Sequence, residues 1–103
     1  MGIINHDGYD WEYLDTPITD TYITLHNNAI AVIKTVGQDQ WRVAASFSIY
    51  KDLASYTAGR RLLDTVGVDM YMTTDELNNK KIRDHVYDAL KNIYTNHTEL
   101  PDD

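Results

Sequence analysis

The most regular pattern in the chain is an alternation of apolar and polar positions between residues 41 and 50. Every second residue from Trp41 to Ile49 is apolar, and the residues between them are small or polar. A period of two is typical of a β-strand with one buried face, so we expect a strand over Trp41–Tyr50.

Two shorter stretches before this strand are also rich in β-branched and aromatic residues. Thr21–His26 and Ala29–Val36 each predict a strand, and Asn27–Asn28 between them suits a tight hairpin turn. Residues 37–40, Gly-Gln-Asp-Gln, predict the next turn. Such short connections favour an antiparallel meander.

Helical spacing of apolar residues replaces the alternation after residue 50. A first helix is expected from about Leu53 to Val66, with Asp52 or Ser55 as its N-cap and Gly67 at its end. Gly59 in its middle weakens this helix by about 1 kcal/mol relative to Ala.

A second and stronger helix follows a short strand that alternation predicts over residues 68–72. Thr73 with Glu76 three positions later forms a capping box, and the apolar stripe after it predicts a helix to about Asn96. The stripe consists of Leu77, Ile82, Val86, Ala89, Leu90, Ile93 and Tyr94.

Strands first and helices afterwards predict an α+β fold: a small antiparallel β-meander of three to four strands followed by two helices packed on one face. The 103 residues are enough for one domain with a core. We expect a single domain over residues 1–103, with an acidic, aromatic N-terminal arm over about residues 1–20. The helix stripe is expected to cover the apolar face of residues 41–50.

The net charge of −7 comes from the two ends of the chain. The first twenty residues contain five acids and no Lys or Arg, the last two residues are Asp102 and Asp103, and the acids and bases between them balance. An excess of acid argues against direct binding of nucleic acid or an anionic membrane, which needs Lys and Arg. It favours a basic partner.

No motif for catalysis, metal binding or cofactor binding stands out. The four histidines are scattered, no nucleophile elbow surrounds a serine, and no glycine-rich phosphate loop is present. The chain has no Cys, which fits a reducing compartment, and it has no apolar run long enough to span a membrane. We therefore expect a cytoplasmic, non-enzymatic protein without a metal, a cofactor or a catalytic residue.

Aromatic and acidic residues alternate in the arm, where Tyr9, Trp11 and Tyr13 are separated by Asp10 and Glu12. One interpretation is an edge strand whose aromatic residues pack on the sheet and whose acids face water. Another is partial mimicry of a nucleic-acid strand, with acids in place of phosphates and aromatic rings in place of bases. The two are compatible, because a docked strand still presents its acids. The expected partner-binding residues are Asp7, Asp10, Trp11, Glu12, Tyr13, Asp15 and Asp20.

In size, charge and coarse topology, the chain is similar to the small acidic α+β proteins with which phages and mobile elements block nucleic-acid enzymes, some type II anti-CRISPR proteins among them. This resemblance implies a non-enzymatic inhibitor that binds a basic nucleic-acid-binding surface of a host protein. Asp64, Asp69 and Asp75 would widen the acidic face.

Three other functions remain open on the sequence. An immunity or antitoxin protein against a basic toxin requires the same electrostatics. A homo-oligomeric structural or regulatory protein of a phage or bacterium, a homodimer for example, would pair its arm with a neighbour's sheet edge. A small enzyme is the fourth interpretation.

Overall fold

The computed structural model describes residues 2–10 and 16–100, apart from the side chains of residues 27 and 28. These residues form five strands and three helices. The strands are β1 (Gly2–Asn5), β2 (Thr21–Lys34), β3 (Trp41–Tyr50), β4 (Asp64–Met72) and β5 (His97–Leu100). The helices are α1 (Leu53–Thr57), α2 (Thr74–Asn78) and α3 (Ile82–Ile93).

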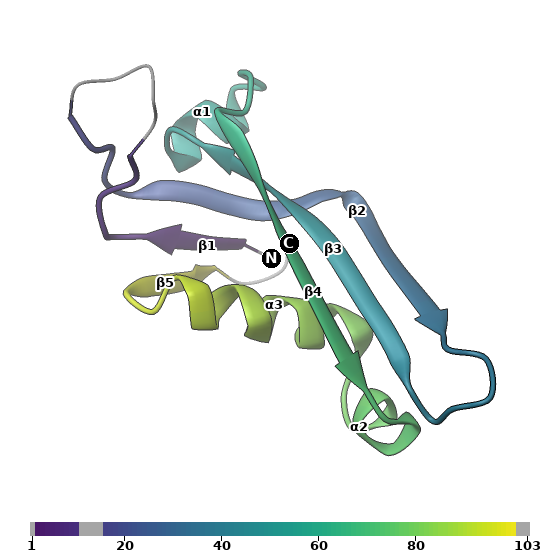
Figure 1. Cartoon of the computed structure of the whole chain (residues 1–103). Helices are drawn as coiled ribbons and strands as arrows, with labels where there is room; N and C mark the ends of the chain where they lie inside the picture. The colour runs from purple at the N-terminus through teal and green to yellow at the C-terminus, as the bar shows by residue number, and fades with distance from the viewer. Residues whose placement is uncertain (1, 11–15, 101–103) are drawn as a thin grey trace.

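All five strands belong to one antiparallel sheet with the order β4-β3-β2-β1-β5 (Figure 1). The α+β class is confirmed. Strands β2, β3 and β4 form an antiparallel meander of sequential neighbours, although its members differ from the expected strands over 21–26, 29–36 and 41–50. The expected strand count is wrong, because the two ends of the chain add β1 and β5 to the sheet. The first residues of the predicted arm are therefore an inner strand, with β2 on one side and β5 on the other.

The predicted hairpin at Asn27–Asn28 is wrong. One strand runs from Thr21 to Lys34, and its register with β3 shifts between Leu25 and Ile30. Residues 26–29 stand opposite Ser46 alone, and β2 bends at this irregularity (Figure 1). The local turn preference of two asparagines thus produces a bulge, because both halves of β2 pair with the same strand, β3.

The first helix is much shorter than predicted. Asp52 caps it as expected, accepting a hydrogen bond of 2.7 Å from the Ser55 backbone N–H, but α1 ends at Thr57. Gly59 follows with a φ of 73°, a left-handed conformation in which a helix ends. Val66 lies on β4 opposite Phe47, because the apolar residues from 66 to 72 also fit a period of two.

The predicted capping box is confirmed, although the long helix is wrong. Thr73 accepts from the Glu76 backbone N–H, and the Glu76 carboxylate accepts from the Thr73 backbone N–H at 3.0 Å. This box begins only α2, which ends at Asn78, and a separate helix, α3, starts at Ile82. It ends at Ile93, before β5.

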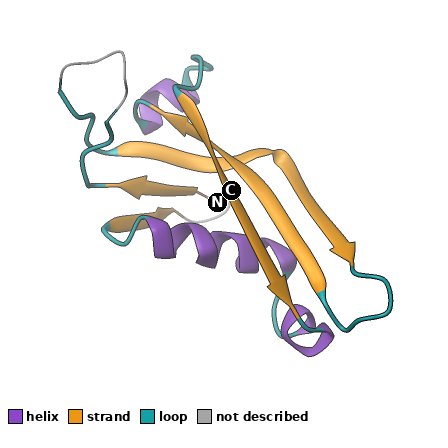
Figure 2. Cartoon of the chain, in the orientation of Figure 1, coloured by secondary structure: helices purple, strands orange, loops and turns teal. Residues whose placement is uncertain are grey.

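One helix, α3, covers one face of the sheet (Figure 2). Its Val86, Tyr87 and Leu90 are fully buried, and the Tyr87 ring contacts the Phe47 ring edge-on at 5.1 Å between centroids. Neither α1 nor α2 contains a buried residue, so the expectation of two helices packed on one face is wrong. The core consists of Ile3, Ile23, Leu25, Val43, Ala45, Phe47, Ile49, Val68, Met72, Val86, Tyr87 and Leu90.

The opposite face of β2, β3 and β4, called the open face below, has no helix packed across its middle (Figure 2). The molecule measures 49 × 30 × 23 Å, and its long axis follows the twisted ribbon of these three strands. Within the described residues, no helix combines the length and apolar character needed to cross a membrane.

Candidate functional site

The chain between β1 and β2 contains the expected partner-binding residues. Asp7, Asp10 and Asp20 belong to the described part of this segment. Trp11, Glu12, Tyr13 and Asp15 lie outside the described residues, and with them most of the predicted alternation of aromatic and acidic side chains.

Two backbone hydrogen bonds close this segment into a loop. The N–H of Tyr9 donates to the carbonyl of Ile18 at 2.8 Å, and the N–H of Ile18 donates back to Tyr9 at 2.9 Å. Residues 10–17, called the acidic loop below, therefore leave and rejoin the body of the protein at one point. The segment is not a free tail, because both ends of the loop are tied to each other.

A side-chain contact fastens the base of the acidic loop to the sheet. The Tyr9 hydroxyl donates a hydrogen bond to the carboxylate of Asp64, the first residue of β4. Burial of Tyr9 and this hydrogen bond raise the pKa of the Tyr9 phenol well above its usual value. The same bond lowers the pKa of the Asp64 carboxyl. Asp64, one of the acids expected to widen the acidic face, thus lies beside the loop.

Asp7 and Asp20 are each bonded to the body of the protein. The Asn96 side-chain amide donates to the Asp7 carboxylate at 3.1 Å, and the Asp20 carboxylate lies 2.7 Å from Nδ1 of His6. Asp10 is exposed. None of these three acids forms an ion pair with Lys or Arg within the part of the chain that the structure describes.

Some acids elsewhere on the surface, namely Asp69, Asp88 and Glu99, are paired with basic neighbours. The Asp69 carboxylate accepts hydrogen bonds of 2.7–3.1 Å from Nε and Nη2 of Arg42. Asp88 forms ion pairs with Lys80 and Lys91. The expectation that Asp69 widens an acidic face is therefore weakened, because its charge is matched. Near the loop, Asp7, Asp10 and Asp64 have no basic partner among the described residues, and Asp20 has His6.

His6 joins three distant parts of the chain. Its Nδ1 meets Asp20, and its Nε2 lies 2.6 Å from the Thr98 hydroxyl on β5. The order of carboxylate, imidazole and hydroxyl is that of a nucleophile relay. His6 follows β1, Asp20 precedes β2 and Thr98 lies on β5, so the group joins these three strand ends. Asp20 adopts a φ of 59°, which places its carboxylate at His6.

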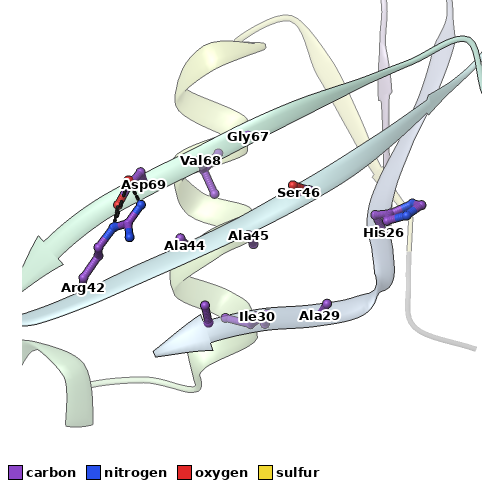
Figure 3. Close-up of a pocket in the computed structure, with 11 residues that line it drawn as sticks. His26, Ala29, Ile30, Arg42, Ala44, Ala45, Ser46, Gly67, Val68 and Asp69 are labelled. Carbon is purple, nitrogen blue, oxygen red and sulfur yellow. Dashed lines mark hydrogen bonds and ion pairs between the residues drawn. The ribbon is translucent and has the colours of Figure 1, made fainter. Parts of the chain in front are cut away.

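The open face contains a shallow hollow of about 750 Å³. Short side chains on the three strands, Ala31, Ala44 and Ser46 with Gly67 beside them, make its floor. Figure 3 shows His26 at one end and the Arg42–Asp69 pair at the other. The hollow is open and largely apolar, so it suits a flat apolar group of a partner better than an enclosed small molecule.

His26 at the end of the hollow is fixed by a buried hydroxyl. Its Nδ1 lies 2.6 Å from the Oγ of Ser48, which is 2% exposed. Ser48 is thus inaccessible as a nucleophile. The small side chains on the polar side of residues 41–50 were visible in the sequence and could have indicated this hollow.

The second half of β2 forms an edge of the sheet. Strand β1 pairs with β2 only over Thr21–Thr24, whereas β3 continues to pair with it over Ile30–Lys34. No other described strand pairs with Ile30–Lys34, and Ile33 is 53% exposed there. This stretch is called the free edge below. The run Ala-Ile-Ala-Val-Ile predicts a hairpin strand, and its lack of charge is in addition a signal for such an edge.

Within the described residues, no three His, Asp or Glu side chains are grouped so that they could bind a metal ion. Comparisons with protein-family models, curated proteins and solved structures found no match.

Proposed function

We propose that this protein is a small non-enzymatic inhibitor that binds a basic, nucleic-acid-binding surface of a host protein through the acidic loop. The observation behind this proposal is the closure of the loop by Tyr9 and Ile18 and its attachment to Asp64. A tied loop presents its charges with less loss of chain entropy on binding than a free tail does.

Charge supports the choice of partner. Asp7, Asp10 and Asp64 have no Lys or Arg partner among the described residues, and Glu12 and Asp15 add two acids to the same segment. Unmatched acids attract a basic surface and accelerate association more than they strengthen the final complex. Trp11 and Tyr13 would serve as anchors, since Trp and Tyr are enriched among residues that dominate binding energy.

The proposed class is that of an anti-CRISPR or nucleic-acid-mimic protein of a phage or mobile element, acting in the cytoplasm. An immunity protein against a basic toxin would use the same loop. In both, the partner is a basic protein, and neither nucleic acid nor a membrane is bound directly.

The test starts from capture of partners from host lysate by the full chain, with identification by mass spectrometry. A triple variant, Asp10→Asn, Glu12→Gln and Asp15→Asn, keeps the size and shape of the three side chains and removes three charges. Its matched control, Asp75→Asn, Asp102→Asn and Asp103→Asn, removes three other charges. Asp75 lies on α2, at the other end of the molecule from the start of β2 (Figure 1), so it does not extend an acidic face around the loop as expected.

We expect the loop variant to lose the partner and the control to retain it, and the loop variant to show slower association with a smaller salt dependence. The captured partner should also lose its binding of nucleic acid when the wild-type chain is added. Equal capture of the partner by both variants would show that the acidic loop is not part of the binding surface.

A further inference from the structure

We propose that the free edge of β2, residues Ile30–Lys34, pairs with the same edge of a second copy of this chain. The pairing would join two sheets into one through antiparallel strands about a two-fold axis. This interface lies apart from the acidic loop, so it is independent of the function proposed above.

The backbone of the free edge has donors and acceptors pointing outward. The N–H of Thr35 donates to the carbonyl of Gln40 at 2.8 Å, which marks these two as a hydrogen-bonded pair between β2 and β3. In an antiparallel ladder the direction alternates, so Ile33 also faces β3, whereas Ile30, Val32 and Lys34 direct their N–H and C=O groups to the edge. An extended strand is the structure that satisfies such a row of groups.

A second copy fits this row because the edge is self-complementary. The stretch paired with β3 runs from Ile30 to Lys34, so its centre is Val32. An antiparallel pairing centred there places Val32 against its own copy and Ile33 against Ala31 of the other copy. Lys34 then faces Ile30, so no like charges are opposed. Val32, 38% exposed, and Ile33, 53% exposed, would both gain apolar neighbours.

The other two edges of the sheet are protected in the usual ways, and the free edge is not. Strand β4 contains Asp64 and Asp69, and β5 has four residues, of which Glu99 is bonded to Lys91. Charges and short length discourage pairing at an edge. Residues 29–33 have neither a charge nor a proline.

The excess negative charge does not oppose this pairing. The end of β1 and the start of β2 lie at one end of the long molecule, and the tip of β2 lies at the other (Figure 1). Lys34 is the single charged residue between positions 29 and 36, and its ammonium group is placed over the Trp41 ring, 5.7 Å from the centroid. Two copies joined at their free edges therefore keep the ends of β1 and the starts of β2, between which the acidic segments run, far apart.

A contact of five residues per strand is small for a stable interface, so we expect a weak dimer that forms as concentration rises. Sedimentation equilibrium or light scattering of the full chain over a concentration series should show a shift from monomer to dimer. Val32→Lys opposes two ammonium groups at the two-fold axis and should raise the dissociation constant about tenfold or more. Val36→Lys adds the same charge at a side chain 96% exposed, beyond the paired stretch, and should leave it unchanged.

Cysteine cross-linking tests the register, because the chain contains no natural Cys. In the proposed pairing the two Val32 Cα atoms are about 5.5 Å apart, which a disulfide can span. Val32→Cys should thus form a covalent dimer on mild oxidation, much faster than Val36→Cys. A chain that stays monomeric at every concentration with equal cross-linking of the two variants would overturn the proposal, as would a dimer that Val32→Lys leaves intact in a folded protein.

Discussion

The hydroxyl of Tyr87 on α3 accepts a hydrogen bond of 3.0 Å from the backbone N–H of Leu25 on β2. Leu25 follows Thr24, the last residue of β2 paired with β1, and precedes the irregularity of β2. Tyr87 is 1% exposed. A side chain from the helix thus satisfies a buried strand donor at the point where β2 passes from one set of neighbours to the other.

Tyr87→Phe removes this acceptor and keeps the ring against Phe47. We expect the free energy of unfolding to fall by about 1–3 kcal/mol, because the Leu25 N–H would be buried without a partner. Urea denaturation measures the change. Tyr71→Phe is the control, since Tyr71 is 60% exposed, and it should alter stability little. An equal, small effect of both substitutions would show that water or a neighbour replaces the Tyr87 hydroxyl.

Phe47→Ala and Val86→Ala test the contact between the sheet and α3. Both side chains are 0% exposed, on opposite sides of the core. Each truncation should lower the free energy of unfolding by about 2–5 kcal/mol, as large-to-small changes in cores do. Val36→Ala, at a side chain 96% exposed, should change it by less than about 0.5 kcal/mol. If Phe47→Ala and Val86→Ala lowered the free energy of unfolding as little as Val36→Ala does, α3 would have to cover other residues of the sheet.

Local pattern predicted β3 correctly because its period, its burial and its pairing agree along the whole strand. The local pattern did not predict β2 correctly, because the turn preference of Asn27–Asn28 competes with the pairing to β3 of the residues before and after these two asparagines. Residue Val66 fits a helical and an alternating pattern equally well, and only the pairing with Phe47 decides between them. Strands β1 and β5 have four residues each and pair with each other from opposite ends of the chain, so neither has a local signal.

The candidate site was predictable only in its composition. The acids of residues 7–20 are evident in the sequence, and the free edge is visible as an uncharged apolar run. The contacts that position them are not, because Tyr9 and Asp64 are 55 residues apart and His6 and Thr98 are 92 apart. Such distant residues come into contact only when the strands that precede or contain them are placed together in the folded sheet.

Two glycines in the sheet should respond differently to a methyl group. A Cβ at Gly2 would lie 2.5 Å from the hydroxyl oxygen of Tyr22, whose ring is buried and packed against Tyr56 at 4.8 Å between centroids. Gly2→Ala should therefore lower the free energy of unfolding by about 1–3 kcal/mol. A Cβ at Gly67 would meet its nearest atom, the Ala45 carbonyl oxygen, at 3.9 Å.

Gly67→Ala is the matched comparison for Gly2→Ala. It should leave stability unchanged or raise it by up to about 1 kcal/mol, because alanine restricts the unfolded chain more than glycine does. Thermal and urea unfolding of the two variants should give changes of opposite direction or clearly different size. Equal losses would mean that Tyr22 moves aside easily at Gly2.

Tyr9 should make the attachment of the acidic loop sensitive to alkaline pH. Burial and the hydrogen bond to Asp64 raise the pKa of the Tyr9 phenol in the folded protein, and burial, with a smaller effect of Asp64, raises that of Tyr94 nearby. A group whose pKa is raised by folding stabilises the fold fully below its unfolded pKa, here about 10, and this contribution is lost as pH rises through the folded pKa.

The wild-type midpoint of thermal unfolding should thus fall more steeply above about pH 10 than that of Tyr9→Phe, which has no phenol to ionise beside Asp64. At neutral pH, Tyr9→Phe should be somewhat less stable, since the hydrogen bond to Asp64 is absent. Tyr71→Phe removes an exposed phenol instead, and its midpoint should follow the wild-type curve. The three chains are compared from pH 7 to pH 11, and the difference between wild type and Tyr9→Phe reports the Tyr9 phenol and its contact with Asp64. Parallel curves would mean that the Tyr9 phenol ionises as freely in the folded chain as in the unfolded one, and that the contact with Asp64 does not fasten the acidic loop to β4.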